Sequence, residues 1–552
     1  MSLWAQDGYA IPDATARTAR AAFPKGCMAL RIRDQLGELF RDGDFAGVFP
    51  VRGRPGLSPA RLMLVSILQF AEGLTDRQAA DAVRGRLDWK YALGLDLDDS
   101  GFDASVLTEF RQRLLTEDEP ARLLQLMLDR LRDRGLLRSG GRQRTDATSV
   151  VMSVREVNRL EQVAETMRAA LEAIAAAAPD WLAAHWQPDW PVRYGQRATD
   201  YRLPNGKQAR DEYAVVVGGD GFALMQAVYA ETDRSWLAEL HQVEVLRATW
   251  IQQYYRSGDT VVFRDSDSGL PPGARFILSP YDVDARHGFK HHAKWLGYKA
   301  HFTEACEPDL PHLLVHVATS HAATSDIEVM ADLHADLAAA DLLPDEHLVD
   351  AGYVSVDGVL HARDQYGISV VGPLPPDSAW QARDPDAFDI SRFRIDFDNR
   401  TVTCPNGKVA INWWEGLNRN QLPIVHVGFG RRNCTPCNDR ALCTRSRDNP
   451  RSLTFRPQRQ FAEQQRIRAE QATPEWRRQY AHRSGAESTM AQASARADVH
   501  RTRYRGLAKT HLQNVLIAIA LNLIRLDAWL SGALIGKAWT SRLTKISTAL
   551  AA

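Results

Sequence analysis

The sequence predicts an α/β core with two insertions, preceded by an all-α N-terminal domain. Helices are predicted from Ser58 to Leu137, so residues from about 20 to 138 look like one all-α domain. β-Branched strands begin at residue 142, and strands then alternate with helices as far as residue 371. A chain of 552 residues also exceeds the length at which one hydrophobic core keeps growing, so we expect several domains.

The composition is typical of a soluble globular protein, with 45% hydrophobic and 25% charged residues. The 68 basic residues equal the 68 acidic residues, so a site for a polyanion must be a local patch. Arginine gathers at 440–468 and 483–505, which suits phosphate contacts, although a GC-rich genome would also produce an arginine-rich chain. The N-terminus lacks the pattern of a signal peptide, and the most apolar run, Val515 to Leu521, is too short to span a membrane. We therefore expect a cytoplasmic protein.

The N-terminal domain, residues 1–138, contains a predicted pair of helices joined by a glycine turn. After an irregular start, Ser58 and Pro59 have the pattern of an N-cap followed by proline at the first helical position, and Gly73 ends the helix. Thr75 and Gln78 form a predicted capping box that opens the next helix. This outline fits a DNA-binding helix-turn-helix, and it also fits an ordinary helical hairpin, which is commoner. Further helices are predicted at Ser105–Leu115 and Pro120–Leu137.

Two acidic residues lie on predicted strands of the core, residues 139–375. Residues 142–151 alternate and are β-branched, and Asp146 in their middle is disfavoured there unless its carboxylate is used. The alternative is the solvated face of an edge strand. Asp350 ends a buried strand that begins at Glu346, and α/β sheets display reactive groups at the carboxyl ends of their strands. The other core elements are strands at 296–304, 313–318 and 368–371, and helices at 327–337 and 356–363.

A helical insertion at about 155–256 interrupts these strands. Its apolar spacing predicts one helix from Leu160 to Ile174 and another from Trp236 to Tyr255. Acidic residues follow in loop-like sequence, and we expect them to act in turns and caps rather than at a metal site: Asp265, Asp267, Asp282 and Asp284.

The second insertion, residues 376–478, contains short predicted strands at 393–397 and 424–429 and a group of cysteines. Cys434 and Cys437 have the spacing of a zinc knuckle. With Cys404 and Cys443 they make a candidate four-thiolate structural zinc site. The alternative is that the thiols are buried and bind nothing.

The C-terminal part, residues 479–552, combines an acidic residue with many cations. Glu487 follows Tyr480 and Arg483, and a basic run from Arg501 to Leu512 leads into a helix with apolar spacing. A carboxylate beside cations could hold a metal ion against a phosphate that the arginines grip. A surface helix with a solvated run of charges would have the same residues.

Asp146, Asp350 and Glu487 form an ordered Asp, Asp, Glu set. The elements that carry them run strand, strand, strand, helix, strand, helix, strand, helix, which is the order of the ribonuclease-H-like fold. In that fold the first and fourth strands are neighbours and the last helix packs beside them. Three carboxylates meeting there would hold two Mg²⁺ ions, because hard oxygen ligands suit Mg²⁺ and its open positions take phosphate oxygens.

Several further motifs accompany these carboxylates: Phe102-Asp103 with Phe110-Arg111, Thr145-Asp146-Ala147-Thr148, Tyr201-Arg202-Leu203-Pro204, Gly219-Asp220-Gly221, Gly297-Tyr298-Lys299-Ala300-His301, Asp350-Ala351-Gly352-Tyr353, the late cysteines, and Arg501 to Leu512. With them, nearly the whole chain resembles the DDE transposases of bacterial insertion sequences, and it looks closest to the group named after insertion sequence eleven-eighty-two. Tyr480, Arg483 and Glu487 also match the Tyr-two-Arg-three-Glu spacing of the wider family. Ser494 stands where that signature has a lysine, which is a departure.

The resemblance implies that Asp146, Asp350 and Glu487 are the catalytic residues and the magnesium ligands. Glu470 and Glu475 are the nearest competitors for the third place. The expected cofactor is Mg²⁺, for which Mn²⁺ can substitute, beside a structural Zn²⁺ at the cysteines. The expected DNA-binding residues are Tyr480, Arg483, Arg496, Arg501, Arg503, Arg505 and Lys509.

The implied reaction is a cut-and-paste-like transposition, in which metal-activated water nicks the element end and the freed 3′-OH attacks target DNA. The expected partners are double-stranded DNA with terminal inverted repeats, target DNA and a second copy in an active homodimer. The expected place is the bacterial cytoplasm, on the nucleoid when DNA is bound, and not a membrane. The alternatives are a nuclease of the same fold without strand transfer and a non-catalytic DNA-binding protein derived from a transposase.

Overall fold

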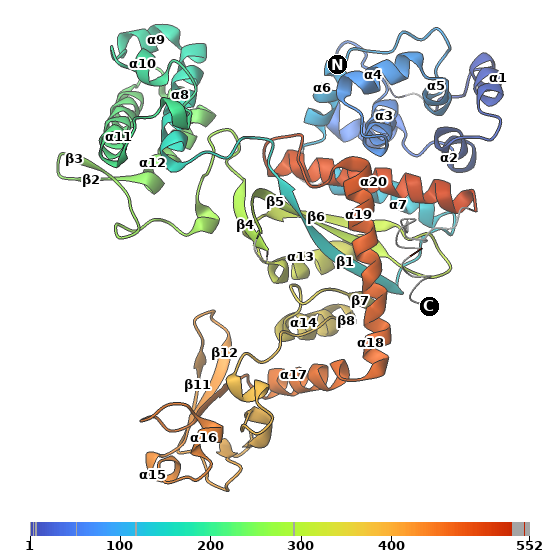
Figure 1. Cartoon of the computed structure of the whole chain (residues 1–552). Coiled ribbons are helices and arrows are strands. Elements are labelled where there is room, and N and C mark those ends of the chain that lie inside the picture. The colour runs from blue at the N-terminus through green and yellow to red at the C-terminus, as the bar shows by residue number, and fades with distance from the viewer. Residues whose placement is uncertain are drawn as a thin grey trace. The chain divides into compact units, whose positions relative to one another are not determined.

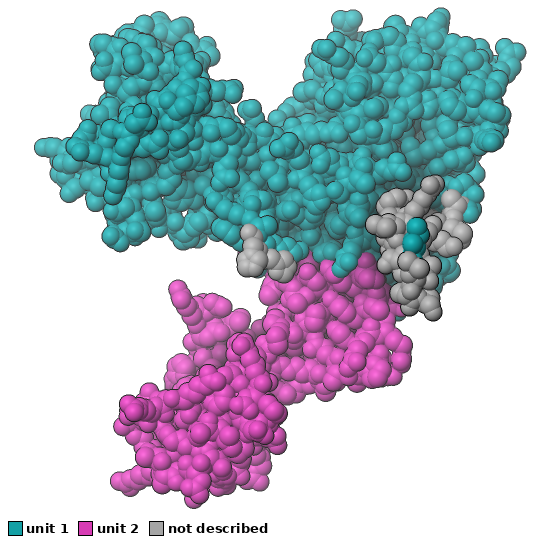
Figure 2. Space-filling view, viewed as in Figure 1, with its two compact units in different colours: residues 1–325, 485–552 teal, residues 326–484 magenta. Residues whose placement is uncertain are grey.

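The computed structural model describes residues 2–3, 5, 8–50, 52–115, 119–290, 293–532 and 546. It consists of two compact units, residues 1–325 with 485–552, and residues 326–484 (Figure 2). The chain therefore leaves the first unit after residue 325 and returns to it at residue 485. This division differs from the four consecutive parts expected from the sequence.

Helices form the N-terminal part of the first unit (Figure 1). They are α1 (Asp13–Ala22), α2 (Met28–Leu36), η1 (Asp42–Val48), α3 (Pro59–Ala71), α4 (Asp76–Gly85), α5 (Leu87–Leu93), α6 (Ser105–Arg113) and α7 (Glu119–Arg132). The predicted caps are confirmed, because the Ser58 side chain accepts the Arg61 N–H and Thr75 forms a capping box with Gln78. Every residue of α3 except Arg61 is buried, so α3 is an internal helix.

The predicted irregular start before residue 58 is wrong, since α1 and α2 are regular helices. The sequence of α1 is rich in alanine and arginine, and the residues it buries are Thr15 and Ala19. Helix α1 contains no large apolar side chain, so a search for large apolar residues at helical spacing did not reveal it.

The sheet of the first unit is built on β5 (Ala293–Ala305). It pairs antiparallel with β1 (Arg142–Val151), β4 (Arg286–Lys290) and β6 (Leu314–His321). The predicted strands at 142–151, 296–304 and 313–318 are confirmed, whereas β4 was not predicted. In the register of β1 and β5, Arg144 lies opposite Glu304 and Asp146 lies opposite Phe302. Because side chains alternate along a strand, Arg144 and Asp146 lie on the same face of β1.

Helix α20 (Leu507–Leu530) packs against β6, α2, α3 and α7 in the first unit. Two carboxylates cap its N-terminus. Oδ1 of Asp282 accepts the Gly506 N–H at 3.3 Å, and Oδ2 of Asp284 accepts the Leu507 N–H at 3.0 Å. Negative charge at this end stabilises a helix. The expectation that these two aspartates act as cap residues is therefore confirmed.

By length and composition, α20 and α11 (Lys207–Ala230) could each cross a membrane. Of the most apolar window of α20, 72% is buried inside the protein, against 33% for α11. Asn522 of α20 also exchanges two hydrogen bonds of 2.7 and 2.8 Å with the backbone of Leu314 on β6. These are the surroundings of a core helix.

Residues 159–263 form a mostly helical region with its own hydrophobic core. Its elements are α8 (Arg159–Ala177), α9 (Pro179–Ala184), α10 (Trp190–Tyr194), η2 (Asp200–Arg202), α11, η3 (Ser235–Glu239), α12 (His241–Gln253), β2 (Tyr254–Ser257) and β3 (Thr260–Phe263), followed by η4 (Gly273–Arg275). The sequence did not single out α11, because its packing face uses small residues. A Cβ on Gly218 would lie 2.6 Å from the Tyr254 ring, and one on Gly221 would lie 2.2 Å from the Trp250 ring.

The second unit begins with α13 (Asp326–Ala339), β7 (Glu346–Leu348), α14 (Val356–Tyr366) and β8 (Ser369–Val371), and β7 and β8 pair in parallel. These elements confirm the predicted alternation of helices and strands. The rest comprises η5 (Trp380–Arg383), η6 (Ile390–Arg392), β9 (Arg394–Asp396), β10 (Thr401–Thr403), β11 (Asn412–Leu417), β12 (Pro423–Gly428), α15 (Arg431–Cys434), α16 (Arg440–Cys443), β13 (Ser452–Phe455), α17 (Gln458–Gln471), α18 (Pro474–Ala481) and η7 (His482–Ser484).

In the first unit a buried carboxylate, Glu304 on β5, is bound by arginines from two other elements. Arg144 of β1 donates Nε to it at 2.6 Å, and Arg525 of α20 donates Nη1 at 2.8 Å. Thr489 of α19 (Gly485–Ala497) donates its hydroxyl at 3.0 Å. The Glu304 side chain is 3% exposed, and the two arginine side chains are 9% and 8% exposed. Four elements therefore meet at one buried negative charge.

We expect Glu304→Gln to destabilise the first unit strongly. The substitution leaves two buried guanidinium groups without their counter-charge, and breaking a buried ion pair in this way costs about 3–5 kcal/mol. Urea unfolding followed by circular dichroism measures this loss. As a control, Glu244→Gln removes a surface partner of Arg247 and should cost less than about 1 kcal/mol. Equal stability of the two variants would contradict a structural role for the buried pair.

Candidate active site

Asp146 lies in the middle of β1 and is 7% exposed. Its Oδ1 accepts the backbone N–H of Ala147 at 2.9 Å. The side chain is on the same face of the strand as Arg144, which Glu304 holds in place. Asp146 is therefore not a solvated residue of an edge strand, which was the alternative that the sequence allowed.

Glu487 lies in the first turn of α19, and this helix packs directly on β1. Gly485 begins the helix against the guanidinium of Arg144, where a Cβ would lie 1.9 Å from Nη1. One turn later, Thr489 reaches Glu304. Glu487 lies outside the helix face that Gly485 and Thr489 share, and it is exposed. The strand that carries Asp146 and the helix that carries Glu487 thus belong to one packed assembly.

Asp350 belongs to the second unit; β7 ends at Leu348, so Asp350 lies just beyond the carboxyl end of this strand and is not its last residue, which corrects the prediction. Its Oδ1 accepts the Gly352 N–H at 2.8 Å. Its Oδ2 lies 3.8 Å from Nη2 of Arg483, whose side chain is only 13% exposed. Arg483 was expected to contact DNA, and in this structure it faces a carboxylate instead of extending into solvent.

A second carboxylate lies beside Asp350, and the sequence reasoning missed it. A Cβ built on Gly352 would lie 3.0 Å from Oδ1 of Asp350 and 3.0 Å from Oδ2 of Asp326. Asp326 opens α13. An acidic residue in the first turn is usual for any helix, so the sequence carried no signal for this position.

The competing carboxylates make local contacts. Glu470 pairs with Arg466 on α17, and Glu475 pairs with Arg478 at 2.7 Å on α18. Asp265 accepts two backbone N–H groups of its own turn, as expected. Ion pairs on exposed helices contribute little to stability, and these carboxylates have the surroundings of ordinary surface residues.

The basic segment after α19 is fixed to the end of β1. The Val151 N–H donates to the His500 carbonyl at 2.7 Å, and the Thr502 N–H donates to the Val151 carbonyl at 3.0 Å. The hydroxyl oxygen of Thr148, on the same strand, lies 3.1 Å from Nδ1 of His500. The basic segment is therefore hydrogen-bonded to the last residue of the strand that carries Asp146.

The side chains of the expected DNA-binding residues differ in their surroundings. Arg503 donates to the Leu74 carbonyl at 2.7 Å and lies 4.9 Å from the centre of the Phe70 ring, so it also joins the basic segment to the N-terminal helices. Tyr480 stacks on Trp476 with the ring centres 4.8 Å apart. The remaining ones are exposed: Arg496, Arg501, Arg505 and Lys509.

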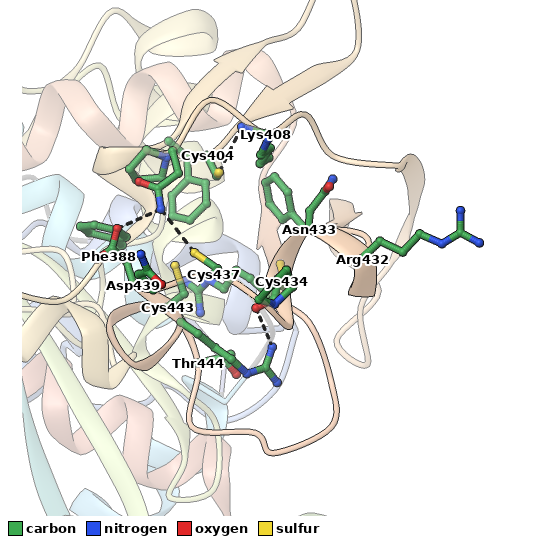
Figure 3. Close-up of a pocket in the computed structure, with 18 residues that line it drawn as sticks. Phe388, Cys404, Lys408, Arg432, Asn433, Cys434, Cys437, Asp439, Cys443 and Thr444 are labelled. Carbon is green, nitrogen blue, oxygen red and sulfur yellow. Dashed lines mark hydrogen bonds between the residues drawn. The ribbon is translucent and has the colours of Figure 1, made fainter.

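The four late cysteines line one cavity of about 360 Å³ in the second unit (Figure 3). All four are free thiols. Burial raises the pKa of the Cys443 thiol to about 11, with Arg451 acting in the opposite direction and the other three cysteines adding to the increase. Within the described ranges, no three His, Cys, Asp or Glu side chains are arranged as a ready-made metal site.

Two family models match parts of the chain. The family model described as "Transposase DDE domain" matches residues 403–527, and the model described as "Transposase domain (DUF772)" matches residues 17–113. The first match includes Glu487 and the late cysteines, and the second extends from within α1 to the end of α6. No curated protein and no solved structure matches the chain. Residues 17–113 and 403–527 are therefore similar to transposase domains, in agreement with the resemblance to the DDE transposases of insertion sequences.

Proposed function

We propose that this protein cuts DNA at the ends of its insertion sequence and joins the freed 3′ ends to target DNA by a two-metal-ion mechanism. The observation that carries the proposal is the packing of α19 on β1, which fixes the helix with Glu487 against the strand with Asp146. The resemblance to the eleven-eighty-two group adds the expectation that Asp350 completes the catalytic set with Asp146 and Glu487.

We propose a ribonuclease-H-like fold for the core, with insertions at about 155–256 and 376–478. The antiparallel strands β1, β5 and β6, followed by α13, β7, α14 and the parallel strand β8, support it. The first and fourth strands are neighbours in that fold. The proposal therefore requires Asp350 of the second unit to come beside Asp146 of the first.

Asp146, Asp350 and Glu487 would hold the metal ions. Carboxylate oxygens are the ligands that Mg²⁺ prefers, and Mn²⁺ accepts the same donors. The carboxylate of Asp350 is oriented by the Gly352 N–H, which leaves further lone pairs for a cation. When bound, two such ions activate a water or a 3′-OH and stabilise the leaving oxygen at phosphorus.

Other residues of the chain would bind and orient the DNA. The exposed cations Arg496, Arg501, Arg505 and Lys509 suit phosphate contacts that do not read sequence. The N-terminal helices are then left to recognise the terminal inverted repeats. Pairing two element ends calls for a homodimer, which would act on the nucleoid in the bacterial cytoplasm.

The first prediction concerns cleavage. A plasmid that carries the gene with its native flanking DNA supplies the element's own ends. With Mg²⁺, the wild-type protein should produce 3′-OH ends and joined products, and EDTA should abolish both. Asp350→Asn should lower cleavage by more than about a hundredfold, because even changes to residues around metal ligands cost 10- to 100-fold. The matched control is Glu475→Gln, which removes an exposed carboxylate paired with Arg478 and should leave both steps intact.

Other results of the cleavage assay would favour a different function. Hydrolysis without joining would favour a nuclease of the same fold, and DNA binding without cleavage by either protein would favour a non-catalytic DNA-binding protein. Full activity of Asp350→Asn would contradict the assignment of this carboxylate.

The second prediction concerns how the affinity for DNA depends on salt concentration. Arg501→Ala combined with Lys509→Ala should weaken binding to all duplexes alike. It should also flatten the plot of log affinity against log salt by about 0.9 for each phosphate that the protein no longer neutralises. Fluorescence anisotropy at several salt concentrations measures both effects. Arg247→Ala, a surface residue of α12 paired with Glu244, is the control and should leave the slope unchanged. An unchanged slope in the double variant would place the DNA on another surface.

A further inference from the structure

The cysteine cavity in the second unit has features that catalysis by the three carboxylates does not use. Cys404 follows β10, Cys434 ends α15, Cys443 ends α16, and Cys437 lies between these two short helices. Figure 3 shows all four around the same cavity. Thiols from two distant segments, near residue 404 and at 434–443, therefore converge on one space.

Two of the sulfurs already accept hydrogen bonds from nitrogen donors. The Lys408 N–H lies 3.3 Å from the Cys404 sulfur, and Nδ2 of Asn406 lies 3.3 Å from the Cys437 sulfur. The Cys404 N–H donates to the Lys408 carbonyl at 2.8 Å, and Gly407 takes a φ of +73° in this tight turn. Donors aimed at sulfur stabilise thiolates and orient them, as outer-shell partners do around bound metals.

Positive side chains supply a charge balance. Four thiolates around one Zn²⁺ carry a net charge of −2, and Arg440 and Arg451 line the same cavity. Arg440 donates to the Cys434 carbonyl at 3.3 Å and to three carbonyls of the loop 446–449. It thereby ties the loop to the segment that carries three of the cysteines.

The hydrophobic core beside the cavity is small. Its buried residues are Phe393, Val402, Val425, Val427, Phe429, Leu453 and Phe455, and Cys404, Cys434 and Cys443 pack against them. Small folds with a limited core commonly need a staple such as a metal or a disulfide. The four thiols are free, so a disulfide does not fill that role here.

We propose that Cys404, Cys434, Cys437 and Cys443 bind one Zn²⁺ in a closed, structural four-thiolate site. The metal fastens the turn at 404–408 to the segment 434–443. Since the sulfurs are not yet arranged as a ready-made site, binding includes rotation of cysteine side chains into tetrahedral geometry. Four protein ligands leave no open position, so this zinc takes no part in DNA cleavage.

The test measures metal on the purified full-length protein. Elemental analysis of the wild type should find one zinc per chain. Cobalt exchanged into the site should show the intense charge-transfer absorption of thiolate-bound, tetrahedral Co²⁺. Cys437→Ser should lose at least nine-tenths of the zinc and this absorption, because three thiolates hold the ion far less tightly. Cys27→Ser, which removes a half-buried thiol of the first unit, is the matched control and should retain both.

If Cys437→Ser does not fold, zinc release from the wild-type protein tests the proposal instead. Titration with an organomercurial should release the zinc as four thiols react. Asp350→Asn should keep its zinc, so failure of the zinc proposal is separable from failure of the proposed cleavage. A wild type that binds no zinc after reconstitution, disulfides at these cysteines, or wild-type zinc in a folded Cys437→Ser would each overturn the proposal.

Discussion

The buried ion pair at Glu304 is the interaction on which the candidate active site most depends. Its carboxylate receives hydrogen bonds from Arg144 of β1 and from Arg525 of α20, and also from Thr489 of α19. A charge removed from water is costly unless it is fully paired, so these elements have one arrangement that satisfies it. The arrangement holds the helix of Glu487 on the strand of Asp146. This buried contact thus helps to hold together the strand and the helix that carry two of the proposed metal ligands, Asp146 and Glu487.

Much of the fold was predictable from local pattern. The cap at Ser58, the capping box at Thr75 and the strand around Asp146 follow from spacing and residue type, and the structure has all three. Helix α1 has no large apolar residue, so a search for such residues at helical spacing missed it, and α11 packs through glycines, so its apolar periodicity was weak. The division into two units could not be predicted, because it depends on residues 485–552 returning to the first unit.

The residue types of the candidate site could be predicted from the sequence. The buried contacts that hold the elements of the site in place could not. The order Asp146, Asp350, Glu487 is visible in the chain, and so is the cluster of late cysteines. The partners of Glu304 are 160 and 221 residues away in sequence, a distance at which no periodicity links them. Asp326 beside Asp350 was missed because an acidic residue in the first turn of a helix is usual and carries no special signal. Local sequence patterns indicate which residue types are candidates for the site. Contacts between residues far apart in the sequence determine which of their side chains lie close together.

We propose that Asp146, Asp350 and Glu487 bind the same metal ions. Fe²⁺ bound in place of Mg²⁺ generates hydroxyl radicals with ascorbate and peroxide, and these cut the polypeptide next to the metal. Mass spectrometry of the fragments locates the cuts. We expect cuts close to Asp146, Asp350 and Glu487 in the DNA-bound protein. Excess Mg²⁺ should suppress the cuts at all three positions, and Asp350→Asn should abolish them at all three. Cuts close to Asp350 alone, cuts close to Asp146 and Glu487 alone, or cuts that persist in Asp350→Asn would contradict this proposal.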